Sequence, residues 1–97
     1  MAKKYKLRQA AREDLKEIGR YTIKNHGRTQ RDKYLAGLGE RFELLGENPY
    51  FSRPRNEIKE GYHSSEYGKH VVFYTIQEGY VEILAILHES MEPERHI

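Results

Sequence analysis

Two arginines, a lysine and two histidines in this sequence carry the side chains needed for acid–base chemistry on a phosphate ester. Attack of a ribose 2′-hydroxyl on the adjacent phosphate requires a base, a proton donor and cations around the phosphorus. His63 and His88 can transfer protons, and Arg53, Arg55 and Lys69 can stabilise the developing charge. No spacing in the sequence forces these residues to converge. Their presence therefore does not by itself predict catalysis.

Aromatic residues and histidines add further candidates. The chain has eight tyrosines and three phenylalanines, which indicates half-exposed rings with hydrated hydroxyls. Tyr67 or Tyr74 can stack on an unpaired nucleobase. The histidines show no recognisable metal-ligand spacing, so neither a metal site nor a cofactor is expected. These histidines are His26, His63, His70, His88 and His96.

Composition limits the class of protein. The 97 residues suit a single domain spanning residues 1–97, and the absence of cysteine excludes disulfides and thiolate chemistry. The net charge of +2 is far weaker than that of a dedicated DNA-binding domain, so sequence-specific DNA binding is not expected. The longest aliphatic run, Ile83–Leu87, is too short for a membrane span. We expect a cytoplasmic protein without a membrane partner.

The C-terminal third contains the strongest strand signal. Residues His70–Gln77 are rich in β-branched and aromatic types, and Glu78-Gly79 provides a turn. Tyr80–Leu87 then runs back through five consecutive aliphatic residues, Ile83–Leu87. Such a run is tolerated where water is excluded from both faces, so it predicts a central strand.

The N-terminal half predicts a short strand and two helices. Lys4–Arg8 alternates basic and apolar residues, as an edge strand does. Ala10–His26 has a helical apolar stripe and is followed by a glycine suited to a helix C-terminus. The second helix is expected to start at Thr29, as a cap paired with Asp32, and to stop at Asn48-Pro49.

Two glycines lie inside this second helix, at positions 37 and 39. Each costs roughly 1 kcal/mol relative to alanine. Gly37 and Gly39 therefore indicate either close approach of another part of the chain or a tolerated weakness.

The remaining segment completes the expected topology. Residues 49–61 contain prolines, a glycine and charges and predict a loop, and Tyr62–Tyr67 predicts a short strand. The order is β-α-α-β-β-β, which gives a two-layer α+β domain with a helical hairpin on one face of a mostly antiparallel sheet. The other face of the sheet is expected to be open.

Four segments carry a resemblance to a known family. They are ARxDLxEI at residues 11–18, NPYFSRPR at 48–55, GKHVVFY at 68–74 and EILAILHESMEPERHI at 82–97. With them, nearly the whole sequence resembles the ParE-type toxins of the RelE/ParE superfamily from bacterial toxin–antitoxin pairs. The final segment is the most specific. Its matching residues are Ile86, Leu87, His88, Met91, Glu92, Arg95, His96 and Ile97.

Two positions depart from the family pattern. A serine or threonine usually precedes the first helix, where this chain has Arg8 and Gln9. Leucine-arginine-serine often opens the second strand, where this chain has Tyr62-His63-Ser64. His63 thus places a titratable group where a fixed cation is common, which bears on target binding more than on the fold.

The resemblance implies a toxin that binds DNA gyrase, blocks it with DNA cleaved, and is held inactive by a ParD-like antitoxin. Relatives of RelE type instead cut messenger RNA on the ribosome. Under that alternative Arg55, His63, Lys69 and His88 would be catalytic; under the gyrase interpretation no residue is catalytic.

Site residues follow from the tail and from a proline-stiffened loop. We expect the target to contact Arg53, Arg55, His88, Met91, Arg95 and His96. We expect the antitoxin to cover the exposed sides of the helices around Tyr21 and Tyr34, with a helix and an added strand.

These residues also have purely structural interpretations. His88 can lock the tail through hydrogen bonds, Met91 and Ile97 can pack the tail against the body, and Arg53 and Arg55 can be solvated loop cations.

Overall fold

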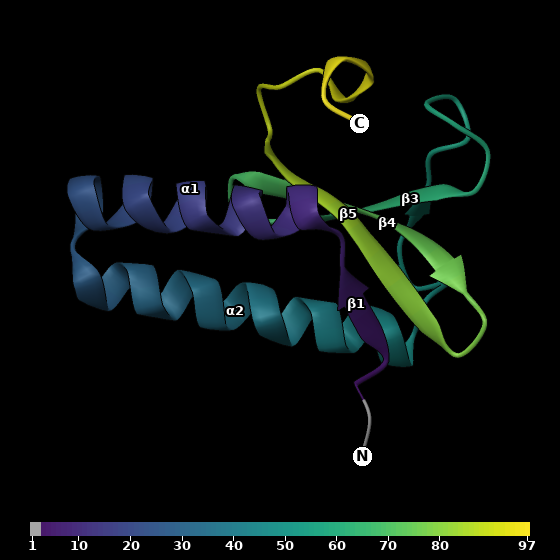
Figure 1. Ribbon diagram of the computed structural model, residues 1–97, viewed down its shortest axis with the longest axis horizontal. Coiled ribbons are helices and arrows are strands. Elements are labelled where there is room, and N and C mark those ends of the chain that lie inside the picture. Colours follow the sequence, from purple (N-terminus) through teal and green to yellow (C-terminus); the bar gives the residue numbers. More distant parts are fainter. Residues whose placement is uncertain (1–2) are drawn as a thin grey trace.

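The protein forms two layers, a helical hairpin and a sheet, in the computed structural model, which describes residues 3–97 (Figure 1). The first two residues of the expected 1–97 domain lie outside this range. The predicted α+β class is confirmed. In chain order the elements are β1 (Tyr5–Leu7), α1 (Gln9–His26), α2 (Arg28–Glu47), β2 (Arg53–Pro54), β3 (Tyr62–Tyr67), β4 (His70–Gln77), β5 (Tyr80–His88) and the 3-10 turn η1 (Pro93–Arg95).

The sheet has the order β1-β5-β4-β3-β2. β1 pairs with β5 in parallel, and the other neighbours are antiparallel. The aliphatic residues of β5 are buried on both faces, as the unbroken run predicts. The residues of β2 were expected to be loop, but Arg53 pairs with Ser64 and Pro54 with His63 at the edge of the sheet. Proline is tolerated in an edge strand because no amide hydrogen is needed there to pair with a further strand.

The helical hairpin is tighter than the sequence indicates. Gly27 is the single residue between α1 and α2 and caps both helices, with a positive φ of 89° that glycine adopts readily. The predicted Thr29 cap is wrong, because α2 already begins at Arg28 and has no side-chain cap. Figure 1 shows the two helices lying side by side, with their connection projecting beyond the sheet.

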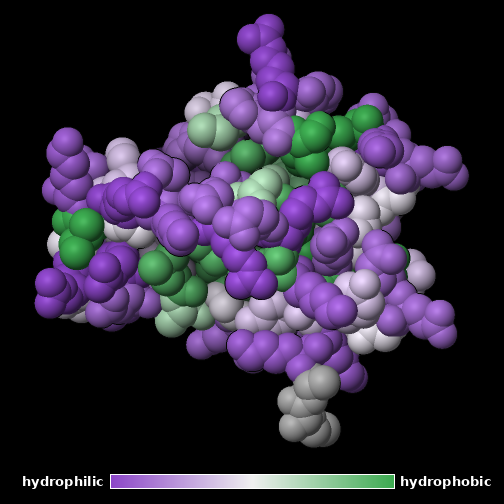
Figure 2. All heavy atoms as spheres, viewed as in Figure 1, coloured by the Kyte–Doolittle hydropathy of each residue, from purple (hydrophilic) through white to green (hydrophobic). Residues whose placement is uncertain are grey.

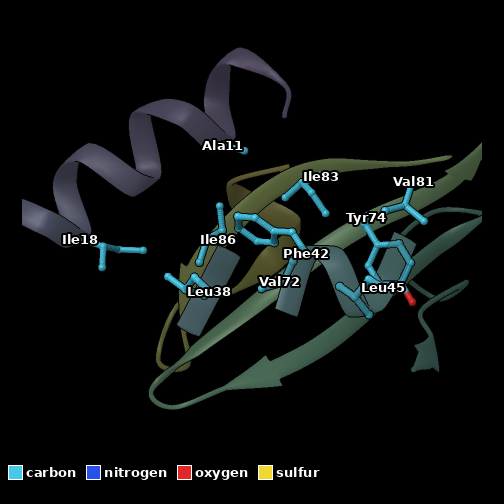
Figure 3. Packing of buried hydrophobic residues seen from close by; sticks show 10 residues of the cluster. All are labelled: Ala11, Ile18, Leu38, Phe42, Leu45, Val72, Tyr74, Val81, Ile83 and Ile86. Atoms are coloured by element: carbon cyan, nitrogen blue, oxygen red, sulfur yellow. The ribbon is translucent and has the colours of Figure 1, made fainter. Parts of the chain in front are cut away.

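One hydrophobic core joins the two layers. Leu38, Phe42 and Leu45 of α2 contribute side chains that are almost fully buried, and Ala11 and Ile18 come from α1. In Figure 3 these side chains meet the inner face of the sheet. The strand residues of this core are Val72, Tyr74, Val81, Ile83 and Ile86.

The outer face of the sheet is not open, contrary to expectation. Phe73, Ala85 and Leu87 are buried there in a second, smaller cluster. Ile58 from the loop and Ile97 from the C-terminal tail pack against it. The tail therefore folds back over the sheet, and the expected packing of Ile97 is confirmed.

The two helical glycines have different surroundings. A Cβ on Gly37 would lie within contact distance of the Tyr67 ring, only 2.6 Å from Cζ, whereas a Cβ on Gly39 would meet nothing within 4 Å. Gly37 thus permits close packing against β3, and Gly39 is a tolerated weakness. The Tyr67 ring has little freedom to move, since it packs edge-on against Tyr34 and lies under the guanidinium of Arg41.

We predict opposite effects of alanine at these glycines. Gly39→Ala should raise the free energy of unfolding by about 1 kcal/mol, because alanine favours the helix and meets no obstacle. Gly37→Ala should lower it by about 1–3 kcal/mol through overpacking against Tyr67. Urea unfolding followed by circular dichroism measures both. Equal stabilisation by the two substitutions would show that Tyr67 does not limit the space at Gly37.

Candidate functional site

A hollow of about 1000 Å³ lies between the first helix and the far end of β5. We call it the α1–β5 groove. Its residues include Asp14, Ile18 and Tyr21 of α1, Tyr34 of α2, the stretch from Lys69 to His70, the stretch from Ile86 to His88, and Met91.

Large apolar side chains are exposed along this groove. Tyr21 is 64% exposed and Met91 is 44% exposed, although both are apolar enough to be buried. In Figure 2 most of the visible surface is hydrophilic, and apolar side chains gather toward the middle of the view and near the C-terminal segment. Exposed apolar groups beside a groove are typical of surfaces that bind a partner.

Asp14 connects the helix to the sheet at the groove. β1 pairs with β5 only as far as Ile83, so the β5 residues beyond it have no strand on that side. The Ile86 amide donates instead to the Asp14 carboxylate at 2.9 Å. Burial raises the pKa of Asp14, opposed by this hydrogen bond and by nearby His96. Asp14 therefore replaces the missing strand at one point.

The rest of that β5 edge is open. The Glu89 amide donates to the Lys69 carbonyl at 2.8 Å. This bond makes the adjacent pair, His70 and His88, a non-hydrogen-bonded pair, in which backbone groups point away from the partner strand. By the same alternation Val72 and Ile86 are also a non-hydrogen-bonded pair, so the Ile86 carbonyl and the His88 amide both point away from β4, toward the side on which β1 has already ended. The groove thus offers an unpaired strand edge next to apolar side chains.

A hydrogen-bond network closes the end of the groove near the β3–β4 turn. The Tyr34 hydroxyl lies 2.6 Å from His70 Nδ1 and donates to the Tyr67 carbonyl at 3.1 Å. The Lys69 amide donates to the same hydroxyl at 3.2 Å. Burial raises the pKa of the Tyr34 hydroxyl. Burial, together with repulsion from His88, lowers the pKa of His70. The sequence indicated that Tyr34 lies on an exposed side of the helix. In the structure it is half-buried and connects the two layers.

His88 fixes the start of the tail. Its Nδ1 accepts the Ser90 amide at 3.2 Å and lies 2.7 Å from the Ser90 hydroxyl. The Met91 amide donates to the His88 carbonyl at 2.9 Å. These bonds support the structural interpretation of His88, while its ring still lines the groove. Met91 lines the groove too and remains 44% exposed, so it does not pack the tail down.

The arginines predicted to bind the target lie elsewhere, at the edge formed by β2 and β3. Arg53 is exposed, and both Arg53 and Arg55 line a smaller hollow of about 280 Å³. Arg55 is not a solvated cation: it donates to Glu57 at 2.6 Å and to Ser64 at 3.2 Å, and its guanidinium lies over the Phe73 ring. Two of its five N–H groups therefore serve the fold.

The four residues of the ribonuclease alternative do not converge. Lys69 and His88 line the α1–β5 groove, whereas Arg55 lines the smaller hollow. His63 stacks on Tyr74 and lies 3.2 Å from the Gly61 carbonyl, outside both hollows. Tyr74 is fully buried, so it cannot stack on a nucleobase. This geometry provides no assembled acid–base site.

The two polar tail residues that were expected to contact the target, Arg95 and His96, lie on the surface. Arg95 lies in η1 and pairs with Glu92 at 3.1 Å, with its side chain 78% exposed. His96 is exposed and follows directly. Because Ile97 is anchored in the second core cluster, Arg95 and His96 are held in a defined position.

Asp14 and His70 line the groove but were not among the site residues predicted from the sequence. The signal for Asp14 was a carboxylate beside the apolar stripe of the first helix, within the segment that resembles the family. The signal for His70 was its position opposite His88 across the predicted hairpin.

Across residues 3–97, no three histidine, aspartate or glutamate side chains gather as a metal-ligand set. None of the helices in that range combines the length and the apolar character needed to cross a membrane.

Comparison with known proteins identifies relatives over the whole chain. Residues 5–93 match the family model for the ParE toxin of the type II toxin–antitoxin system parDE. Toxin ParE1 of Caulobacter vibrioides is 34% identical over 95 residues, covering 98% of each chain. Toxin ParE1 of Mycobacterium tuberculosis is 32% identical over 98 residues, covering 100% of each. A chain from the chromosomal ParDE system of P. aeruginosa shares the fold, with a TM-score of 0.74 and 17% identity over 87% of this chain and 92% of that one.

We predict that Asp14 can be replaced by an amide but not by a methyl group. Asp14→Ala should lower the free energy of unfolding by about 1–3 kcal/mol, because the Ile86 amide loses its acceptor. Asp14→Asn keeps an acceptor oxygen and should retain most of the stability. Urea unfolding of the two variants beside the parent tests this.

The two variants also differ in pH dependence. The pKa of Asp14 in the folded protein is raised above its ordinary value of 3.8. The parent therefore loses stability as the pH rises from 3.8 through the pKa of the folded state. Asp14→Asn lacks this loss. Between about pH 3 and pH 7 its stability relative to the parent should therefore rise. A constant difference across that range would show that the carboxyl does not titrate as described.

Proposed function

Because the chain belongs to the ParE toxins of type II toxin–antitoxin systems, we propose that it inhibits DNA gyrase and is neutralised by a ParD-type antitoxin bound in the α1–β5 groove. A target that acts on bacterial DNA places this activity in the cytoplasm. No residue of the chain is proposed to be catalytic.

The groove is the observation that supports an antitoxin site. It combines the exposed side chains of Tyr21 and Met91 with an unpaired edge of β5. An extended partner segment can satisfy the Ile86 carbonyl and the His88 amide while its side chains cover the apolar groups. A structural relative comes from a ParDE system, which is consistent with a partner of this type.

The gyrase contact is proposed to centre on the tail. Arg95 and His96 are exposed and held in place by Ile97, and His88 and Met91 line the adjacent groove. An antitoxin in the groove would cover His88 and Met91. Neutralisation then follows by occlusion, because the same two side chains cannot contact both partners.

Replacement of one exposed groove residue tests the antitoxin site. Tyr21→Ala should weaken binding of the cognate ParD-type antitoxin by about tenfold, since a large aromatic contact is lost. Tyr50→Ala is the matched control, because Tyr50 is 79% exposed and lies outside the groove. Isothermal titration calorimetry measures both affinities. Equal affinities for the two variants would place the antitoxin elsewhere.

Replacement of the polar tail residues tests the gyrase contact. The parent should inhibit supercoiling by purified gyrase and leave linear plasmid, while ribosome-bound message stays intact. The double variant Arg95→Ala/His96→Ala should lose most of this inhibition without loss of stability, because both side chains are exposed. Arg28→Ala, at the exposed tip of the hairpin, is the control.

Point substitutions are preferable to truncation, because removing Ile97 would uncover Phe73 and Leu87. Full inhibition by the tail variant would remove the tail from the contact. Cut message together with normal supercoiling would favour the ribonuclease alternative.

A further inference from the structure

Two histidines lie directly opposite one another on the floor of the α1–β5 groove. His70 and His88 are cross-strand neighbours in a non-hydrogen-bonded pair, the arrangement in which facing side chains approach most closely. Their ring centroids are 5.6 Å apart, and the ring planes are nearly perpendicular at 88°. Both rings line the groove. They therefore form one polar patch among apolar neighbours.

The hydrogen bonds of Tyr34 define the protonation of His70. The Tyr67 carbonyl can only accept, so the Tyr34 hydroxyl donates its one hydrogen there. The Lys69 amide donates to one lone pair of the same oxygen. The remaining lone pair faces His70 Nδ1 at 2.6 Å, so this nitrogen carries the hydrogen. In the neutral ring, Nε2 of His70 is then a bare acceptor.

The surroundings of His88 define the opposite arrangement. The Ser90 amide, which can only donate, points at His88 Nδ1 at 3.2 Å. Nδ1 therefore carries a lone pair, and in the neutral ring the hydrogen lies on Nε2. The two rings thus leave different groups unused: an acceptor on His70 and a donor on His88.

We propose that His70 and His88 together bind the side-chain carboxamide of an asparagine or glutamine of the antitoxin. The carboxamide oxygen accepts from His88 Nε2–H, and its NH₂ group donates to His70 Nε2. This assignment rests on the proposed function, that the antitoxin occupies the α1–β5 groove.

Other side-chain classes complement the pair less well. A carboxylate has no hydrogen for His70, and an ammonium or guanidinium group has no acceptor for His88. An aliphatic side chain leaves both nitrogens unpaired under a covering partner, which is costly. A hydroxyl presents its donor and acceptor from one oxygen, whereas the two separate rings call for two atoms. The carboxamide supplies both groups from adjacent atoms.

Asparagine substitutions separate what His70 and His88 do for the fold from what they are proposed to do in the groove. In His70→Asn the new amide can still donate to Tyr34, and in His88→Asn the new carbonyl can still accept the Ser90 amide. Each variant loses Nε2 together with the ring and keeps the hydrogen-bonding atom that the fold uses. Each should bind the antitoxin about tenfold more weakly by calorimetry, with thermal unfolding close to that of the parent.

Matching substitutions in the antitoxin identify the partner residue. Each asparagine or glutamine is changed singly to aspartate or glutamate, which replaces the NH₂ group with an oxygen. One position should lose affinity, and its effect should be non-additive with His70→Asn because both remove the same hydrogen bond.

Three outcomes decide the inference. Unchanged affinity of both histidine variants, with weaker binding by Tyr21→Ala, would overturn the carboxamide site and leave the groove assignment standing. Unchanged affinity of all three would overturn the groove assignment itself. If an asparagine variant does not fold, nitrogen-15 NMR of the parent decides: binding should shift both Nε2 signals, and two unshifted signals would overturn the proposal.

Discussion

The backbone of β5 beyond Ile83 is the constraint on which the functional face of this molecule depends. β1 is too short to pair with it, and a buried amide without an acceptor costs about 1–3 kcal/mol. Asp14 removes that cost at Ile86 only. The open groups that follow, at the Ile86 carbonyl and the His88 amide, are left for a partner. An open strand edge of this kind is a template for pairing with another chain, and the proposed function assigns that place to the antitoxin.

The same strand connects the groove to the tail. Ile86, Leu87 and His88 all line the groove, but successive side chains of a strand point to alternate faces, and Leu87 packs with Ile97 in the cluster on the outer face. This alternation follows from the period of two in a strand. It places the tail residues Arg95 and His96 close to the groove residues without making them part of it. A partner in the groove can therefore interfere with contacts that the tail makes.

Strong local patterns in the sequence predicted the main helices and strands. Features that depend on contacts between distant elements, or on a single backbone conformation, were missed. The aliphatic run at Ile83–Leu87 predicted the central strand because few other structures bury five such residues in succession. β2 was missed because its pairing depends on β3 and not on the propensity of Arg53-Pro54. The start of α2 was misplaced because Gly27 ends one helix and begins the next with no side-chain cap.

The candidate site was less predictable for the same reason. Tyr21 was expected on an exposed helix side and is exposed, whereas Met91 was expected to pack the tail against the body and is exposed instead. Tyr34 looked exposed until its contacts with β3 and β4 were known. Arg55 looked solvated because Glu57, Ser64 and Phe73 come together only in the fold. The proton positions of His70 and His88 required knowledge of every partner of one tyrosine and one serine.

Residue-resolved amide hydrogen exchange, measured on this chain alone and in complex with its ParD-type antitoxin, tests the groove assignment most directly. The His88 amide points away from β4, beyond the last residue at which β1 pairs with β5, and the account predicts that the antitoxin slows its exchange strongly. Amides of the loop at residues 50–52, outside the groove, should change little. Slowing confined to that loop, with His88 exchanging as fast in the complex as in the free chain, would contradict the account.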